Sequence, residues 1–156
     1  MQKQFLFFWT SLLTCFFLSE IGCSSLSSGC GKSLPAGFSS GQTTSLIINA
    51  TDDQPTRQYN VHLSSNYNNN RSHAVVFSFH GHNGDMATQE DLSELSHKGL
   101  IINGAGNIAV YPQGTNGTDG GSSWQGAPYS HPNVDDVITI CSFSFTNILL
   151  LLLLRL

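Results

Sequence analysis

The segment from Ala74 to Asp85 constrains the fold more than any other part of the chain. It reads Ala-Val-Val-Phe-Ser-Phe and then His-Gly-His-Asn-Gly-Asp. Such a run of β-branched and aromatic residues is typical of a buried strand, which ends where the polar His80-Gly81 turn begins. In open α/β sheets, ligands bind just outside the carboxyl ends of the strands. We therefore predict a strand over Ala74–Phe79, followed by a functional turn.

Three other segments are predicted to be strands. Thr44–Ala50 and Arg57–Leu63 are separated by Thr51-Asp-Asp-Gln-Pro-Thr56, which has the composition of a turn. A further strand is expected over Asn107–Tyr111, and it ends at Pro112. After it, the chain from Gln113 to Pro132 is rich in Gly, Asn and Ser and is expected to be a loop.

One helix is expected between the third and fourth strands. Thr88 is the predicted N-cap, because Asp91 follows three residues later and a carboxylate suits the first turn of a helix. Leu92 and Leu95 are expected to share one face, and Lys98-Gly99 is a typical helix end. The order strand, strand, strand, helix, strand predicts the α/β class, with an antiparallel pair leading the sheet.

Composition and charge divide the chain and exclude one class of partner. The sequence has 156 residues and a formal net charge of -4, without a basic patch, so we expect no nucleic-acid binding. Residues 1–22 combine Lys3, an apolar run and small residues, which is the pattern of a secretory signal peptide. The run is shorter than the roughly 20 residues of a membrane span. A Ser/Gly-rich leader (23–43), one domain (44–137) and an apolar tail (138–156) follow.

Three glycosylation sequons agree with secretion to the extracellular space. They begin at Asn49, Asn70 and Asn116, each at a strand end or in a polar loop. Sequons also arise by chance in a chain rich in Asn, Ser and Thr. We predict glycosylation at these asparagines as a hypothesis about a secreted protein.

Two motifs are interpreted as lacking the chemistry that they suggest. Gly37-Phe-Ser-Ser-Gly41 matches Gly-x-Ser-x-Gly, but a nucleophile elbow needs a buried strand before it and a helix after it. Ser39 is therefore interpreted as a surface serine. His80-x-His82 would need further carboxylate or histidine ligands to hold a metal, so we expect neither a metal nor another cofactor.

Two aromatic residues are candidates for substrate binding. Trp124 and Tyr129 lie among small residues in the long polar loop. Amphipathic rings are common in binding sites because they add contact area at a low cost in entropy. The alternative is that both rings form a small core under the loop, and the sequence does not separate these two interpretations.

Taken together, these features resemble the secreted fungal feruloyl esterases of type C, in the polyhydroxybutyrate-depolymerase-like group. The resemblance implies an α/β-hydrolase fold, a Ser-His-Asp triad and cleavage of ferulate from arabinose on plant cell-wall xylan. It also implies that the turn of His80, Gly81 and His82 serves an oxyanion, through the N–H groups of Gly81 and His82. The matching stretches, in chain order, are Gly29-Cys-Gly-Lys-Ser-Leu-Pro35, Arg57-Gln-Tyr59, Phe79-His-Gly-His-Asn-Gly-Asp85, Tyr111-Pro-Gln-Gly114, Ser123-Trp-Gln-Gly126 and Val134-Asp-Asp-Val137.

The resemblance ends at Val137. In that family Asp-Asp-Val opens a helix, and a strand then leads to the Gly-x-Ser-x-Gly elbow, whereas residues 138–156 here are apolar and end in six consecutive leucines, Arg155 and Leu156. The tail has three interpretations: a membrane tail or lipid-anchor signal, a buried terminal helix, or a departure from the ancestral reading frame, which we favour.

The sequence thus predicts a hydrolase sheet truncated before the nucleophile elbow, in a product that lacks the triad and is inactive. Its expected partner is feruloylated cell-wall polysaccharide. The alternatives are an inactive carbohydrate-binding or cell-wall-binding fragment and, if the tail is genuine, a membrane-tethered interaction protein.

Overall fold

The computed structural model describes residues 31–140 except 52, 72, 99, 103 and 138. The expected signal peptide (1–22) lies outside the described residues, and so does the expected tail (138–156) apart from Thr139 and Ile140. The described part of the chain consists mainly of strands and has a mixed α/β character.

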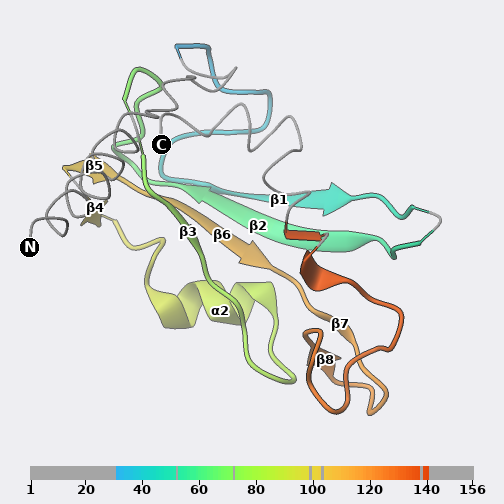
Figure 1. The fold of residues 1–156 in the computed structure, drawn as a ribbon. Coiled ribbons are helices and arrows are strands. Elements are labelled where there is room, and N and C mark those ends of the chain that lie inside the picture. The colour runs from blue at the N-terminus through green and yellow to red at the C-terminus, as the bar shows by residue number, and fades with distance from the viewer. Residues whose placement is uncertain are drawn as a thin grey trace, which may run out of the picture.

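Four strands form the main sheet, in the spatial order β1-β2-β6-β3 (Figure 1). β1 pairs with β2 and β2 with β6 in antiparallel register, which confirms the antiparallel leading pair, whereas β3 lies parallel to β6. Parallel strands need a crossover connection, and helix α2 lies in the segment between these two. The strands span Thr43–Ile48 (β1), Arg57–Leu63 (β2), Val75–Phe77 (β3) and Ile108–Pro112 (β6).

The strand bounds agree with the sequence prediction for β2 and differ by one or two residues elsewhere. β1 and β3 each end two residues before the predicted position, and β3 stops at Phe77 although Phe79 was expected. β3 pairs with β6 on one side, and all three of its residues are only half-buried. The N–H of Ser78 still donates to Val110 O at 2.9 Å. Regular pairing ends after this bond, where the chain turns toward His80.

The two faces of the sheet differ in chemistry. Side chains alternate along a strand, and directly paired residues share a face. Val61, Leu63, Ile108 and Val110 are fully buried on one face, together with Tyr59. The opposite face carries polar residues and receives α2, so the apolar core and the helix lie on different sides of the sheet. Partly buried residues that pack against the core are Leu34, Leu46, Ile48, Tyr67, Val75, Phe77 and Ile140.

Helix α2 spans Met86–Ser93 and begins earlier than expected. Asp85, not Thr88, is the N-cap: its Oδ1 accepts the N–H groups of Ala87 at 2.9 Å and Thr88 at 2.8 Å. Thr88 instead donates its hydroxyl to Asp85 Oδ2 at 3.0 Å. A carboxylate at the cap satisfies two N–H groups that have no partner within the helix, and this outweighs the local pattern at Thr88.

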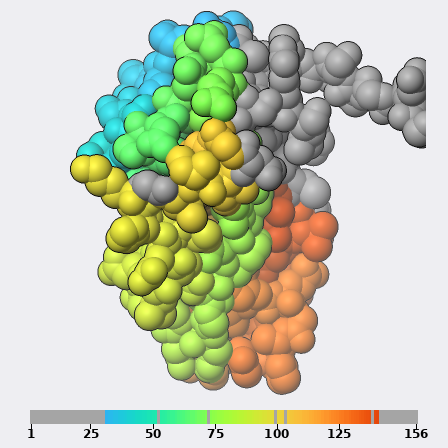
Figure 2. All heavy atoms as spheres, turned by 90° about the vertical axis from the view of Figure 1, so that its left-hand side faces the viewer, coloured from blue at the N-terminus to red at the C-terminus, as the bar shows by residue number. Residues whose placement is uncertain are grey.

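The helix also ends earlier than the sequence suggested. Glu94 has a left-handed φ of 56° and closes α2, so Leu95 lies beyond the helix and shares no helical face with Leu92. Leu92 is 75% exposed. In the side view, α2 and the residues after it, in yellow-green and yellow, form the surface beside the green segment that carries β3 (Figure 2).

A polar network joins α2 to its side of the sheet. Glu90 accepts hydrogen bonds from the Thr43 hydroxyl, from Asn60 Nδ2 at 3.2 Å and from Ser96 Oγ at 2.8 Å. Because each hydroxyl has one hydrogen, Tyr111 must donate to Ser96 Oγ, at 2.8 Å. By the same reasoning His62 Nδ1 donates to Thr43 Oγ1 at 2.8 Å. The carboxylate of Glu90 therefore fixes the direction of every hydrogen bond in this network.

Two short strand pairs and a helical turn complete the described fold. The hairpin of β7 and β8 lies within the expected Gln113–Pro132 loop, beyond the carboxyl end of β6 (Figure 1). Residues 136, 137, 139 and 140 are helical, where the family resemblance implies that a helix begins. Across the described residues, no helix has the length and apolar character that a bilayer crossing needs. The short strands are Ile101–Ile102 (β4), Ala105–Gly106 (β5), Thr115–Asn116 (β7) and Ser122–Ser123 (β8).

Leu63 and Leu92 provide a matched pair for testing the position of the core. Leu63 is 0% exposed and Leu92 is 75% exposed. We expect Leu63→Ala to lower the free energy of unfolding by about 2–5 kcal/mol, because it leaves a cavity in the core. Leu92→Ala is expected to change it by less than about 0.5 kcal/mol. Urea unfolding measures both, and equal effects would contradict the placement of the core.

The pH dependence of stability tests the network around His62. Burial lowers the pKa of His62 from 6.5, although the nearby Glu90 opposes this shift. The unfolded chain therefore binds a proton at His62 more readily than the folded chain does. The contribution of His62 to the free energy of unfolding is therefore fully present above about pH 6.5. It is lost as the pH drops through the lowered folded-state pKa.

We expect the melting temperature to fall between pH 7.5 and pH 5, and to fall less in the variant His62→Gln. An identical fall in both proteins would assign the effect to other groups.

Candidate functional site

The His80 turn lies just outside the carboxyl end of β3, where the sequence placed it. His80 is buried, and its two ring nitrogens have different partners. The N–H of Gly114 donates to Nε2 at 2.9 Å, so Nε2 is the acceptor, and Nδ1 carries the proton and donates to Gly81 O at 2.7 Å. His80 thus joins its own turn to the chain after β6. Protonation of Nε2 would break the Gly114 bond, so the ring acts as an anchor here and not as a base.

The backbone of this turn is held from several sides and leaves two donors unused. Gly84 N–H donates to Gly81 O at 3.0 Å, and Asn83, with a φ of 61°, donates its N–H to Ser122 O at 2.9 Å. Within the described part of the chain, the N–H groups of Gly81 and His82 make no hydrogen bond. No atom lies within 4 Å of where a side chain at Gly81 would stand. The turn is therefore rigid and also open.

His82 forms an exposed cluster with Asp119 and Tyr129. Its Nε2 lies 2.9 Å from Asp119 Oδ2, and its ring lies tilted by 37° against the ring of Tyr129, with the centroids 4.0 Å apart. The N–H of Gly121 lowers the pKa of Asp119, and the charge of His82 acts in the same direction. Asp119 therefore stays ionised beside His82. The structure thus brings Tyr129, one of the two aromatic candidates, against the turn.

Trp124, the other aromatic candidate, packs against the same turn from within the protein. Its indole N–H donates to His80 O at 2.8 Å. The ring meets Phe79 edge to face at 5.1 Å and lies 4.9 Å from the ring of His80. Arg57 Cζ lies 5.8 Å from the centroid of the indole. These contacts let the ring support the turn, and substrate binding by Trp124 stays a prediction.

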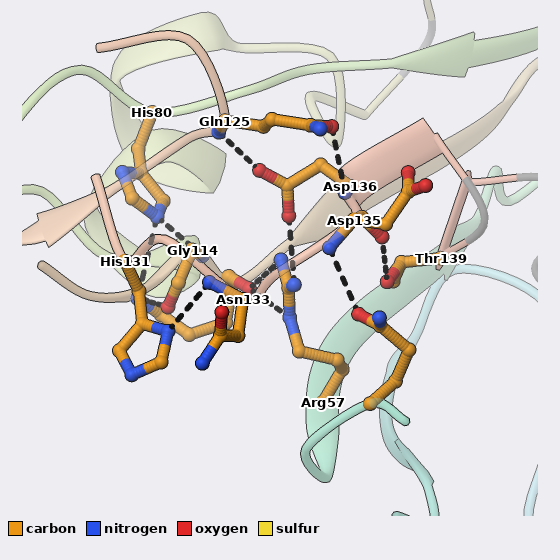
Figure 3. Close-up of polar contacts among 11 residues, drawn as sticks. Arg57, His80, Gly114, Gln125, His131, Asn133, Asp135, Asp136 and Thr139 are labelled. Atoms are coloured by element: carbon orange, nitrogen blue, oxygen red, sulfur yellow. Dashed lines mark hydrogen bonds and ion pairs between the residues drawn. The ribbon is translucent and has the colours of Figure 1, made fainter. Parts of the chain in front are cut away.

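A buried ion pair that the sequence did not reveal joins Arg57 to Asp136 (Figure 3). Arg57 Nη1 and Asp136 Oδ1 are 2.7 Å apart, and their side chains are 2% and 8% exposed. Arg57 also donates Nε and Nη2 to Gln113 O, at 3.3 and 3.1 Å. Asp136 accepts the N–H of Gln125 with its second oxygen. Arg57 is a charged residue at the start of a strand whose other residues are neutral. This contrast was the only sign in the sequence that Arg57 has a buried partner.

Gln113 connects this ion pair to the His80 turn. Its main-chain carbonyl receives Arg57, and its side-chain amide lies 3.3 Å from His80 Nε2. Its Oε1 accepts the N–H of Met86, the first residue of α2, at 2.9 Å. One glutamine therefore contacts the ion pair, the turn and the start of the helix. The sequence placed Gln113 at the start of a loop and in one of the stretches that carry the family resemblance, and neither pattern indicated these contacts.

The remaining candidate residues lie on the surface. Asn49, Asn70 and Asn116 are exposed, as a glycan acceptor has to be, and their glycosylation stays a prediction. Ser39 is exposed in a turn that leads into β1, whereas a nucleophile elbow leads into a helix. Among the described residues, no group of three or more His, Cys, Asp or Glu side chains is placed to hold a metal ion.

Comparison of the chain with known proteins identifies no relative. No protein-family model matches the sequence, and a search of curated proteins finds no significant match. The resemblance to feruloyl esterases therefore stays a hypothesis.

Removal of one partner of the Arg57–Asp136 pair tests its structural weight. We expect Arg57→Met or Asp136→Leu to lower the free energy of unfolding by about 3–5 kcal/mol, because each leaves a buried charge without its partner. The double variant is expected to lose less than the sum of the two single variants, because neither charge is then left uncompensated. Urea unfolding measures all three. Additive losses would show that the two charges do not interact in the folded protein.

Proposed function

We propose that residues 31–140 carry the oxyanion turn of a secreted carboxylic-ester hydrolase of the feruloyl esterase type. Such an enzyme releases ferulic acid from arabinoxylan during degradation of the plant cell wall. One observation carries the proposal: two adjacent N–H groups, of Gly81 and His82, are unused on a rigid and open turn beyond the carboxyl end of β3. Donors held in place in this way stabilise the negative oxygen that forms when an ester carbonyl is attacked.

The surrounding residues support the turn in this role. His80 is held by Gly114 N–H and is unavailable as a base, so its part is to fix the backbone that presents the two donors. Trp124 holds the carbonyl of His80 from the other side. Fixed donors need no rearrangement when charge develops, and this is the main advantage of an enzyme site over water. The proposed fold is an α/β-hydrolase sheet, for which the parallel β3–β6 pair and its crossover through α2 are the support.

The attacking group is proposed to lie outside the described residues. Among the residues that the structure describes, the hydrogen bonds include no serine hydroxyl on a histidine ring; the hydroxyl bonded to an imidazole there is that of Thr43, on His62. The proposal therefore assigns binding of the oxyanion to this part of the protein and assigns nucleophile, base and acid elsewhere. Tyr129, at the rim of the turn beside His82, is the proposed contact for the ring of the ferulate.

A pair of variants at one position tests the turn. The protein needed is a gene product in which residues 31–137 continue into a Gly-x-Ser-x-Gly elbow, as the resemblance implies. His82→Pro removes the N–H, whereas His82→Ala removes only the side chain. With methyl ferulate as substrate, we expect His82→Pro to lower kcat by about 10²–10³-fold, as the loss of one oxyanion donor does. His82→Ala is expected to stay within about tenfold of the parent.

The controls separate loss of a donor from loss of the fold. Both variants are compared with the parent by thermal unfolding, and the kinetic comparison is made between proteins with similar melting temperatures. Equal kcat for His82→Pro and His82→Ala would contradict the proposed oxyanion donor. The 156-residue chain itself is expected to hydrolyse methyl ferulate only at background rate. Turnover that Ser39→Ala abolishes would overturn the interpretation of Ser39 as a surface residue.

A further inference from the structure

Strand β1 forms one outer edge of the main sheet (Figure 1). In an antiparallel pair, residues that bond to the neighbouring strand alternate with residues that do not. Leu63 N–H donates to Gln42 O at 3.2 Å, so Gln42 and every second residue after it face β2. The residues between them turn their N–H and C=O groups toward the outer side of the sheet; they are Thr43, Ser45 and Ile47.

The backbone groups at this edge are unpaired. Among the described residues, no hydrogen bond involves the N–H or C=O groups of Thr43, Ser45 or Ile47. The side chains of all three residues are exposed, and that of Ile47 is an apolar group with 59% of the residue exposed. A row of unpaired N–H and C=O groups is a template on which another strand can pair.

β1 also lacks the features by which sheet edges commonly avoid such pairing. Charged side chains, proline and bulges discourage the addition of a strand. The strand reads Thr-Thr-Ser-Leu-Ile-Ile, and it pairs with β2 residue by residue without a bulge. It has six residues, whereas β3, at the other edge of the sheet, has three. The longer of the two edges is therefore the unprotected one.

The edge is complementary to a second copy of itself. Directly opposed residues that face each other in an antiparallel pair exchange two hydrogen bonds. If Ser45 lies opposite the partner's Ser45, then Thr43 lies opposite the partner's Ile47, and the reverse pair forms as well. Both of these side chains are β-branched and pack well across strands. A two-fold axis perpendicular to the sheet at Ser45 relates the copies, so each face of one sheet continues into the same face of the other.

Helix α2 does not obstruct this approach. It packs on β6 and β2, the two inner strands of the sheet. Its Glu90 reaches the Thr43 hydroxyl and carries the charge nearest to β1 on this face. In the register above, Thr43 and the partner's Thr43 are offset by four residues, or about 14 Å along the strands. The two Glu90 carboxylates therefore do not meet, and no like charges oppose the pairing.

We propose that β1 is a dimerisation edge whose partner is β1 of a second copy of this chain, paired antiparallel about Ser45. The main sheets of the two copies then form one continuous sheet, in which neither β1 is an edge. A single strand pair is a small contact, so the dimer forms reversibly and is not obligate. This inference is independent of ester hydrolysis and of the position of the nucleophile.

Disulfide cross-linking of the full 156-residue chain tests the register. The chain is produced without glycosylation, because the Asn49 sequon directly follows β1. Opposed, bonded residues have Cα atoms about 5.5 Å apart, a distance that a disulfide spans. We therefore expect Ser45→Cys to form a covalent dimer under mild oxidation. Ile47→Cys alone should not, because its two copies lie about 14 Å apart, whereas a mixture of Ile47→Cys and Thr43→Cys should.

The unsubstituted chain is the baseline for cross-linking. Its four native cysteines are present in every protein compared, so the linked positions are identified by mass spectrometry of digests. A cross-link at position 47 as efficient as that at position 45 would overturn the register. Dimers that form without any link at position 45 would place the interface elsewhere and overturn the proposal.

Sedimentation velocity measures the equilibrium itself. Ile47→Lys places a charge on the edge at both symmetric pairs, and we expect it to raise the dimer Kd by about tenfold. Leu92→Lys is the matched control, because Leu92 is an exposed apolar residue on α2, away from the edge, and its Kd should equal that of the parent. Equal weakening by the two variants, or a parent chain that is wholly monomeric at about 0.1 mM, would overturn the proposal.

Discussion

The buried ion pair of Arg57 and Asp136 is the contact on which the geometry of the site depends. Removal of two charges from water costs several kcal/mol for each ion, and this cost is offset only if both are closely paired and hydrogen-bonded. Both conditions hold here, since Arg57 also binds Gln113 O and Asp136 also binds Gln125 N–H. The pair joins the first residue of β2 to a helical turn 79 positions later. It thereby holds the long polar segment after β6 against the sheet.

The His80 turn takes its shape from that segment. Gly114 and Gln113 contact His80 from one side, and Trp124 contacts it from the other. All three belong to the segment that the ion pair holds down. A turn supported only by its neighbours in sequence would not keep two N–H groups fixed and unused. The proposed oxyanion donors therefore depend on this anchoring, because Gly114 holds the ring of His80, the first residue of the turn.

The two faces of the sheet are stabilised by different interactions. Val61 and Val110 face each other in the dry core, whereas Asn60 and Tyr111, one residue away on each strand, face α2. The helix contributes little apolar surface of its own and is held through the hydrogen bonds of Glu90. Because these bonds are directed, they favour one register of the helix on the sheet. That register places Asp85, the N-cap, directly after the turn.

The sequence by itself determined the parts of this protein that depend on local pattern. The composition of Thr51–Thr56 and of the residues after it was enough to predict β2, and the abrupt change at His80 was enough to predict a turn at the end of a strand. The N-cap was misplaced at Thr88 because the carboxylate of Asp85 competes for the same N–H groups. Only the tertiary structure decided the rest. The inward orientation of His80, the pairing of Arg57 with Asp136 and the support of the turn by Trp124 each join residues 34 to 79 positions apart. Periodicity and spacing describe neighbours along the chain, whereas these contacts follow from which strands pair and in which register.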